Sequence, residues 1–301
     1  MRIVTNPGSN LSPAMLARHD IDLSPQKLVV DGISHDTREP VPLSVVDGWI
    51  AGAKQHPYVL GTSAAEFTRL FTEIGRDDPE ILAVMTSRKL IQTHDAAVSA
   101  ARTVATQARH PLRVRVVDTG ITELGTGLVA VMGALGRAAG MALDPLGDML
   151  QRFSAGAQLQ LHVASMDNLI AGGQASFLRG WLANIFHVRP ILTLQGGELA
   201  VAQKVSTRVD PVEMLSIAMT DAFAGRRVWV AVVHGGVPSL AQRLLATLRA
   251  RLDVAYACTR PFSASVYTHV GRGALGCFVL PIDALGWDPP VPEGDGDEAS
   301  A

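Results

Sequence analysis

The sequence has few aromatic side chains and few charged ones. Phe, Trp and Tyr make up 5% of the 301 residues, and charged residues make up 18%, against roughly 25% in typical soluble proteins. Hydrophobic residues nevertheless reach 48%, so the excess is aliphatic. This composition predicts a large apolar interior, part of which could line a cavity.

The sequence also lacks a strong net charge, a long apolar run and a cysteine framework. Its formal net charge is −2, which excludes a broad nucleic-acid surface because such surfaces are basic. Apolar runs such as residues 125–136 reach about 12 residues, and a membrane span needs roughly 20. The start "MRIVTNPGSN" has no signal-peptide core, and Cys258 and Cys277 make no disulfide framework. We therefore expect a cytoplasmic, soluble protein in which Cys277 is a small core residue.

Short β-branched runs alternate with helical patterns along most of the chain. In "DPVEM", Asp210 stands at an N-cap position and Pro211 at the first helical position, which predicts a helix start. Strands that alternate with helices predict an α/β fold with mostly parallel sheets, whose ligands lie at the carboxyl ends of strands. The predicted strands are "RIVT" (2–5), "KLVVDG" (27–32), "EILAVMTS" (80–87), "VRVVDTG" (114–120), "LQLHVAS" (159–165), "RPILTL" (189–194) and "RVWVAVVHGG" (227–236).

The segment "RFSAGAQ" separates a helical pattern from a strand and marks a domain boundary near 152–160. We expect an N-terminal α/β domain over 1–155 and a C-terminal α/β domain over 156–285. The last residues, 286–301, have no apolar pattern, and we expect them to form a disordered tail.

Two polar motifs each permit a structural and a functional interpretation. In "VVHGG", His234 ends a strand before two glycines, which fits either a tight turn or an anion or catalytic site at a helix N-terminus. In "GTSAAEF", Ser63 and Glu66 form a capping box, and the hydroxyls of Thr62 and Ser63 are also available to a ligand. No nucleophile elbow, metal-spaced cluster or standard phosphate loop accompanies them.

The segment "THVGRGALG", residues 268–276, has three glycines beside His269 and Arg272. Glycine this dense costs conformational entropy, so the backbone must come unusually close to something.

Six segments occur in the order and at the spacing of one known family. They are "IVTNPGSNL" (3–11), "TSAAEF" (62–67), "MTSRKLIQTHDAA" (85–97), "VVDTGITELGTG" (116–127), "MDNLIAGGQASFLRGWLANIFHVRPILTLQGGELAVAQKVST" (166–207) and "THVGRGALG" (268–276). Over residues 2–283 the chain therefore resembles the DegV family of two-domain bacterial fatty-acid-binding proteins, in which the last of these segments reads T-H-T-G-P-G-A-L-G.

The resemblance implies a long-chain fatty acid bound in an apolar tunnel between the two domains, with the glycine loop over its head group. It also implies a carrier that does no chemistry itself and presents the lipid to a separate fatty acid kinase, with no cofactor and no metal. The implied ligand-binding residues are Thr62, Ser63, Gln92, Thr93, His269, Gly271 and Arg272, and the implied partner-facing residues are Gln174, Lys204 and Arg208.

The sequence departs from the family pattern mainly on the head-group side. Arg272 replaces the proline of the glycine loop, and Gln174 replaces the arginine after the two glycines. Two other interpretations therefore stay open: an enzyme that uses His234 or His269 as acid or base, and a ligand-free interaction protein. The remaining departures are Asn6 and Pro7 for the early Asp and Ser, Ile91 and Gln92 for Ser and Gly, and Ser206 for the arginine of K-V-R.

Overall fold

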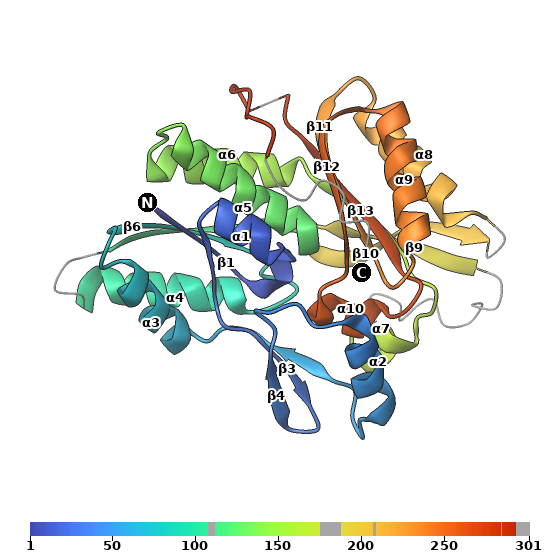
Figure 1. The fold of residues 1–301 in the computed structure, drawn as a ribbon, viewed down its shortest axis with the longest axis horizontal. Helices are drawn as coiled ribbons and strands as arrows, with labels where there is room; N and C mark the ends of the chain where they lie inside the picture. The colour runs from blue at the N-terminus through green and yellow to red at the C-terminus, as the bar shows by residue number, and fades with distance from the viewer. Residues whose placement is uncertain (108–111, 175–187, 207–208, 284, 293–301) are drawn as a thin grey trace.

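The computed structural model describes residues 1–107, 112–174, 188–206, 209–283 and 285–292. In this part of the chain, layers of helices and sheets alternate, with helices outside each of two sheets and a helix layer between them (Figure 1). The α/β fold expected from the sequence is confirmed.

The N-terminal sheet has four strands, all of them parallel. Its outer face is covered by α3 (Ala64–Ile74) and α4 (Thr93–Gln107). The predicted capping box is present at the start of α3, where the Ser63 hydroxyl accepts from the Glu66 N–H and the Glu66 carboxylate accepts from the Ser63 N–H. In spatial order the strands are β2 (Ile21–Leu23), β1 (Arg2–Thr5), β6 (Glu80–Met85) and β7 (Arg113–Asp118).

The C-terminal sheet has six strands, and only the β11–β12 pair is parallel. The expectation of mostly parallel sheets is therefore wrong for this half. One of the antiparallel pairs is formed by β9 and β10, which are joined directly by a hairpin turn at Gly196 and Gly197. Both glycines have positive φ, as a tight two-residue hairpin turn requires. The outer face is covered by α8 (Pro211–Phe223), capped by Asp210 as predicted, and α9 (Pro238–Arg251). The strand order is β10 (Glu198–Ser206), β9 (Val188–Gln195), β8 (Gln158–His162), β13 (Leu275–Pro281), β11 (Arg227–His234) and β12 (Asp253–Pro261).

The two sheets share the layer formed by α5 (Glu123–Ala138) and α6 (Leu143–Ala155). Almost all of α5 is buried, and one apolar cluster extends from the N-terminal sheet through this layer to the C-terminal sheet. Glycine permits this close packing: a Cβ on Gly127 would lie 2.5 Å from the Ser9 carbonyl oxygen. The expected boundary after residue 155 coincides with the end of α6, and the division into two domains stays a prediction.

Between β2 and α3 the chain makes an excursion that forms a small antiparallel sheet and one helix. Its strands are β3 (Lys27–Val30), β4 (Ile33–Asp36) and β5 (Tyr58–Leu60), and its helix is α2 (Leu43–Gly52). The helix packs against α10 (Ala264–Val270) in the C-terminal half. The remaining short elements are η1 (Pro7–Ser9), α1 (Pro13–Arg18) and α7 (Asp167–Ala171).

The packed chain extends beyond the expected boundary at residue 285. Trp287 packs against the large apolar cluster, and Pro289 and Pro292 are buried. Residues 293–301 of the expected tail lie outside the described residues. Cys277 is fully buried and forms no disulfide, so it is a small core residue as predicted. None of the helices in the described ranges has the length and hydropathy needed to cross a membrane.

Two helical glycines provide a matched test of this close packing. Gly127→Ala should lower the free energy of unfolding by about 1–3 kcal/mol, because the new methyl group meets the Ser9 carbonyl oxygen. Gly48→Ala in α2 should raise it by up to about 1 kcal/mol, because nothing lies within 4 Å of the new Cβ and alanine favours helix. Urea unfolding of both variants measures the difference, and equal effects would contradict the packing described.

Candidate functional site

A cavity lies between the two sheets, at the carboxyl ends of the parallel strands. Asn6 follows β1, Thr86 follows β6, and Thr122 lies between β7 and α5, and all three side chains line the cavity. This is the position that an α/β sheet provides for a ligand.

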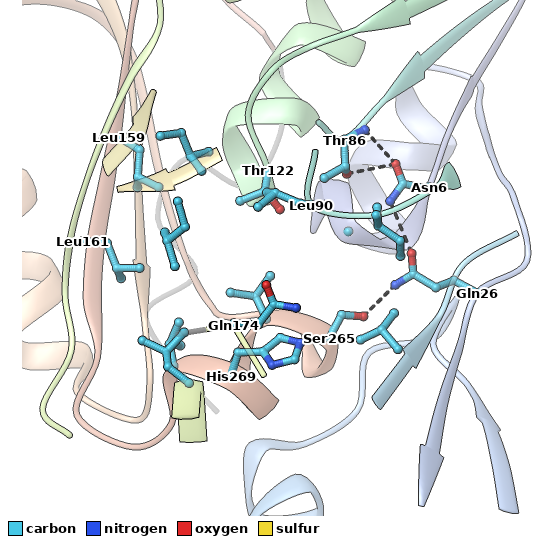
Figure 2. Close-up of a pocket in the computed structure, with 18 residues that line it drawn as sticks. Asn6, Gln26, Thr86, Leu90, Thr122, Leu159, Leu161, Gln174, Ser265 and His269 are labelled. Atoms are coloured by element: carbon cyan, nitrogen blue, oxygen red, sulfur yellow. Dashed lines mark hydrogen bonds between the residues drawn. The ribbon is translucent and has the colours of Figure 1, made fainter. Parts of the chain in front are cut away.

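Most of the cavity wall is aliphatic. The C-terminal sheet contributes a group of leucines that faces the strand ends of the N-terminal sheet across the cavity, as Figure 2 shows for Leu159 and Leu161. The main aliphatic residues are Leu159, Leu161, Leu194 and Leu199 from this sheet, and Leu90 and Ile91 from the loop after β6.

The opposite side carries a chain of hydrogen bonds between polar side chains (Figure 2). The Thr86 N–H and hydroxyl donate to Asn6 Oδ1 at 3.1 and 3.0 Å. Asn6 Nδ2 donates to Gln26 Oε1 at 3.3 Å, and Gln26 Nε2 donates to Ser265 Oγ at 2.6 Å. The cavity therefore has one apolar side and one side of amides and hydroxyls.

His269 lies on α10 and lines the cavity, and its role in ligand binding stays a prediction. Its Nδ1 is buried without a hydrogen-bond partner among the described residues. Burial, with a smaller contribution from the charge of His56, lowers the pKa of His269 to about 4. The ring is therefore neutral near pH 7 and presents a polar but uncharged group.

The glycine loop approaches two other segments closely. A Cβ on Gly271, which has φ +71°, would lie 2.4 Å from Asn168 Nδ2. A Cβ on Gly235 would lie 2.4 Å from the Gly271 carbonyl oxygen, and the Gly273 N–H donates to the Gly235 oxygen at 2.7 Å. The loop is thus packed against the turn after β11 and against α7, which explains its glycines. Arg272 is 81% exposed in its side chain and pairs with Asp47 at 3.2 Å, and it does not line the cavity.

Thr62 and Ser63 make their hydrogen bonds within the protein. The Thr62 hydroxyl donates to the Pro25 carbonyl oxygen and lies 2.8 Å from Ser24 Oγ. The exposed Ser63 side chain belongs to the capping box. Neither residue is part of the cavity wall.

The other residues implied by the resemblance lie in different places. Gln92 is exposed, whereas Thr93 is fully buried, with its hydroxyl close to Gly61 and without a hydrogen-bond partner in the described chain. Lys204 is exposed on β10, at the edge of the C-terminal sheet. Gln174, expected to face a partner, lines the cavity (Figure 2). Arg208 lies outside the described residues.

A buried carboxylate holds the start of α10 in place. Glu123, the first residue of α5, has no exposed surface. Its carboxylate accepts from the Ser263 hydroxyl, from the Ser263 N–H at 3.3 Å and from Asn10 Nδ2 at 2.6 Å. Ser263 is the N-cap of α10, so this carboxylate positions the helix that carries Ser265 and His269.

Sequence reasoning assigned no site role to Asn6, Gln26, Thr86, Ser265 and Glu123. A signal for Asn6 and Thr86 was present, because Asn6 directly follows the predicted strand 2–5 and Thr86 lies at the polar carboxyl end of the predicted strand 80–87. Gln26 and Ser265 come from segments that local sequence does not connect with these strand ends.

The two histidines considered as an acid or base differ in position, because His269 lines the cavity and His234 does not. His234 ends β11, is buried and lies outside the cavity wall, and burial lowers its pKa. The described residues include no group of three or more His, Cys, Asp and Glu side chains that could hold a metal ion. An apolar cavity with one polar side is complementary to an amphipathic molecule, with a hydrocarbon part and a polar head.

Comparison with known proteins gives consistent matches over nearly the whole chain. The family model described as "Uncharacterised protein, DegV family" matches residues 1–281. A DegV domain-containing protein of Streptomyces coelicolor is 29% identical over 92% of this chain and 97% of its own. A protein of Thermotoga maritima named "Fatty acid-binding protein" is 27% identical over 92% of this chain and 96% of its own. In fold, the chain matches a structure described as "Fatty Acid Binding of a DegV family Protein from Thermus thermophilus", with a TM-score of 0.83, 24% identity, and coverage of 94% of this chain and 100% of that one.

The Glu123 carboxylate, which positions α10, should make the stability of the folded protein depend on pH. Burial raises the pKa of Glu123 from 4.5 to about 7. The folded state therefore binds this proton more tightly than the unfolded state, so the stability linked to it is full below about pH 4.5 and is lost as the pH rises through 7. Glu123→Gln imitates the protonated form and should flatten this part of the profile of melting temperature against pH.

Glu66→Gln is the control, because the contribution of the Glu66 carboxylate to stability changes with pH in the opposite direction. Hydrogen bonds from Ser63 lower the pKa of Glu66, so its contribution is lost as the pH falls. If Glu123→Gln leaves the slope between pH 4.5 and pH 8 unchanged, the carboxylate does not titrate as described.

Proposed function

The chain belongs to the DegV family, and from this premise we propose that it binds a long-chain fatty acid or related lipid in the cavity between its two sheets. The observation that carries the proposal is the division of the cavity wall into an aliphatic side and a side of uncharged polar groups. The tail lies along the leucines of the C-terminal sheet, and the head group lies beside Asn6, Gln26 and Ser265.

The energetics of such binding favour a long tail. Burying a methylene group gains roughly 0.8 kcal/mol, so a sixteen-carbon chain gains on the order of 10 kcal/mol before the costs of ordering both partners. The head contributes less, because a polar group that leaves water only regains in the cavity the hydrogen bonds it has lost. The cavity therefore obtains affinity from the tail and selectivity from the head.

The names of similar proteins support the same function. The Thermotoga maritima relative is named a fatty acid-binding protein, and the Thermus thermophilus structure is described as showing fatty acid binding by a DegV family protein.

The second part of the proposal concerns the fate of the lipid. The protein acts as a carrier and presents the bound fatty acid to a separate fatty acid kinase, as the family resemblance implies. Catalysis then belongs to the partner. The chain has Gln174 where the family has arginine, so the lipid-binding step is retained while the transfer step is weakened, because phosphoryl transfer needs cations near the reacting oxygens.

Blocking the apolar side of the cavity tests the lipid site. Leu199→Trp places a larger side chain on the wall and should lower the affinity for palmitic acid by about ten-fold or more, because the tail loses buried methylene groups. Leu240→Trp is the control, since Leu240 lies on α9, packs against the outer apolar cluster and is not part of the cavity wall.

Fluorescence displacement measures the affinity, and native mass spectrometry detects lipid that copurifies with the unmodified protein. An unmodified protein that neither retains lipid nor binds palmitic acid would refute the function.

A paired assay tests the transfer step. The unmodified protein should bind palmitic acid but support little phosphate transfer with the fatty acid kinase of the same organism. Gln174→Arg should increase the transfer by restoring a cation, whereas Gln203→Arg on the exposed side of β10 should not. Full phosphorylation with the unmodified protein would contradict the role given to Gln174.

A further inference from the structure

The hydrogen bonds along the polar side of the cavity run in one direction. The chain begins at a backbone N–H, that of Thr86, which can only donate, and this makes Asn6 Oδ1 the acceptor. Asn6 must then donate through Nδ2, so Gln26 accepts through Oε1 and donates through Nε2. Each amide orientation is therefore set by the preceding bond.

Ser265 is the last member of this chain. Its oxygen accepts from Gln26 Nε2 at 2.6 Å, and the side chain is buried on the cavity wall. No acceptor for the Ser265 hydroxyl hydrogen is present among the described residues. The hydroxyl hydrogen is thus available to a molecule inside the cavity.

Two of the three hydroxyls that the resemblance assigned to the head group are used within the protein, and the third, that of Thr93, belongs to a residue outside the cavity wall. Thr62 donates to the Pro25 carbonyl oxygen, and Ser63 donates to the Glu66 carboxylate at 2.7 Å. Ser265 lies one helical turn before His269 on α10, and both side chains line the cavity. Figure 2 shows Ser265 and His269 beside each other, opposite Leu159 and Leu161.

We propose that Ser265 is a head-group residue of this cavity, which donates a hydrogen bond to an oxygen of the bound lipid, and that Asn6 and Gln26 are positioning residues that fix it as a donor. The inference rests on the proposed lipid binding and specifies the chemistry of the head. The lipid must offer an acceptor oxygen at this point, as a carboxyl, ester or alcohol group does.

Reversing the direction of the chain provides the test. Gln26→Glu keeps the size of the side chain and can still accept from Asn6, but its second oxygen can only accept. The Ser265 hydroxyl then donates to the new carboxylate and presents its lone pairs to the cavity. Methyl palmitate, which only accepts, should bind about ten-fold more weakly to this variant, whereas 1-hexadecanol, which can donate, should stay within about two-fold.

Ser265→Ala is the second variant, and it should weaken methyl palmitate binding by about ten-fold because the donor is removed. Ser154→Ala is the matched control, since Ser154 is also a buried helical serine, its hydroxyl donates to the Gln151 carbonyl oxygen, and it lies away from the cavity. Both probes are neutral, so the charge introduced by Gln26→Glu does not act on a charge in the ligand. Circular dichroism melting confirms that each variant is folded, and Ser265→Ala decides alone if Gln26→Glu does not fold.

The outcomes separate this inference from the proposed function. If the unmodified protein binds methyl palmitate and both variants bind it equally well, the assignment of Ser265 is wrong while lipid binding stands. If the unmodified protein binds neither probe and no palmitic acid, both are overturned. A selective loss of methyl palmitate in Gln26→Glu, with 1-hexadecanol retained, supports the assignment.

Discussion

The hydrogen bonds at Glu123 hold together the segments that build the cavity. This carboxylate is completely buried at the start of α5, where a carboxylate without partners would be very unfavourable. It is satisfied by Asn10, from the loop after η1, and by Ser263, at the start of α10. Asn10 also donates to the Pro261 carbonyl oxygen, so an N-terminal loop and a C-terminal helix are fixed to the same point. The position of α10, and with it one wall of the cavity, depends on this junction.

Much of the fold followed from local sequence because local interactions determine it. The Asp210 cap and the Ser63–Glu66 capping box involve residues two or three positions apart, and both form as predicted. The arrangement of the C-terminal sheet did not follow, because alternating strands and helices favour parallel pairing only where a helix connects neighbouring strands. The glycine pair at residues 196–197 was the signal for a hairpin.

The candidate site was harder to predict than the fold, for a physical reason. A hydroxyl in a loop can bind a ligand or satisfy a nearby backbone group, and the sequence does not show which. The hydroxyls of Thr62 and Ser63 satisfy nearby groups of the protein, whereas His269 and Gln174 line the cavity. The chain of hydrogen bonds through Asn6, Gln26 and Ser265 joins residues 20 and 239 positions apart, so only the folded protein brings it together.

The two sides of the cavity also differ in how they tolerate change. The aliphatic side acts through buried area, which any residue of similar volume supplies, so its contribution is shared among many side chains. The polar side acts through direction, because each amide in the chain is oriented by its neighbour. A single substitution there alters the hydrogen-bonding character of every residue that follows it towards the cavity. Buried apolar area and hydrogen-bond direction are therefore supplied by different residues, and the polar side can change while the aliphatic side of the cavity between the two sheets stays the same.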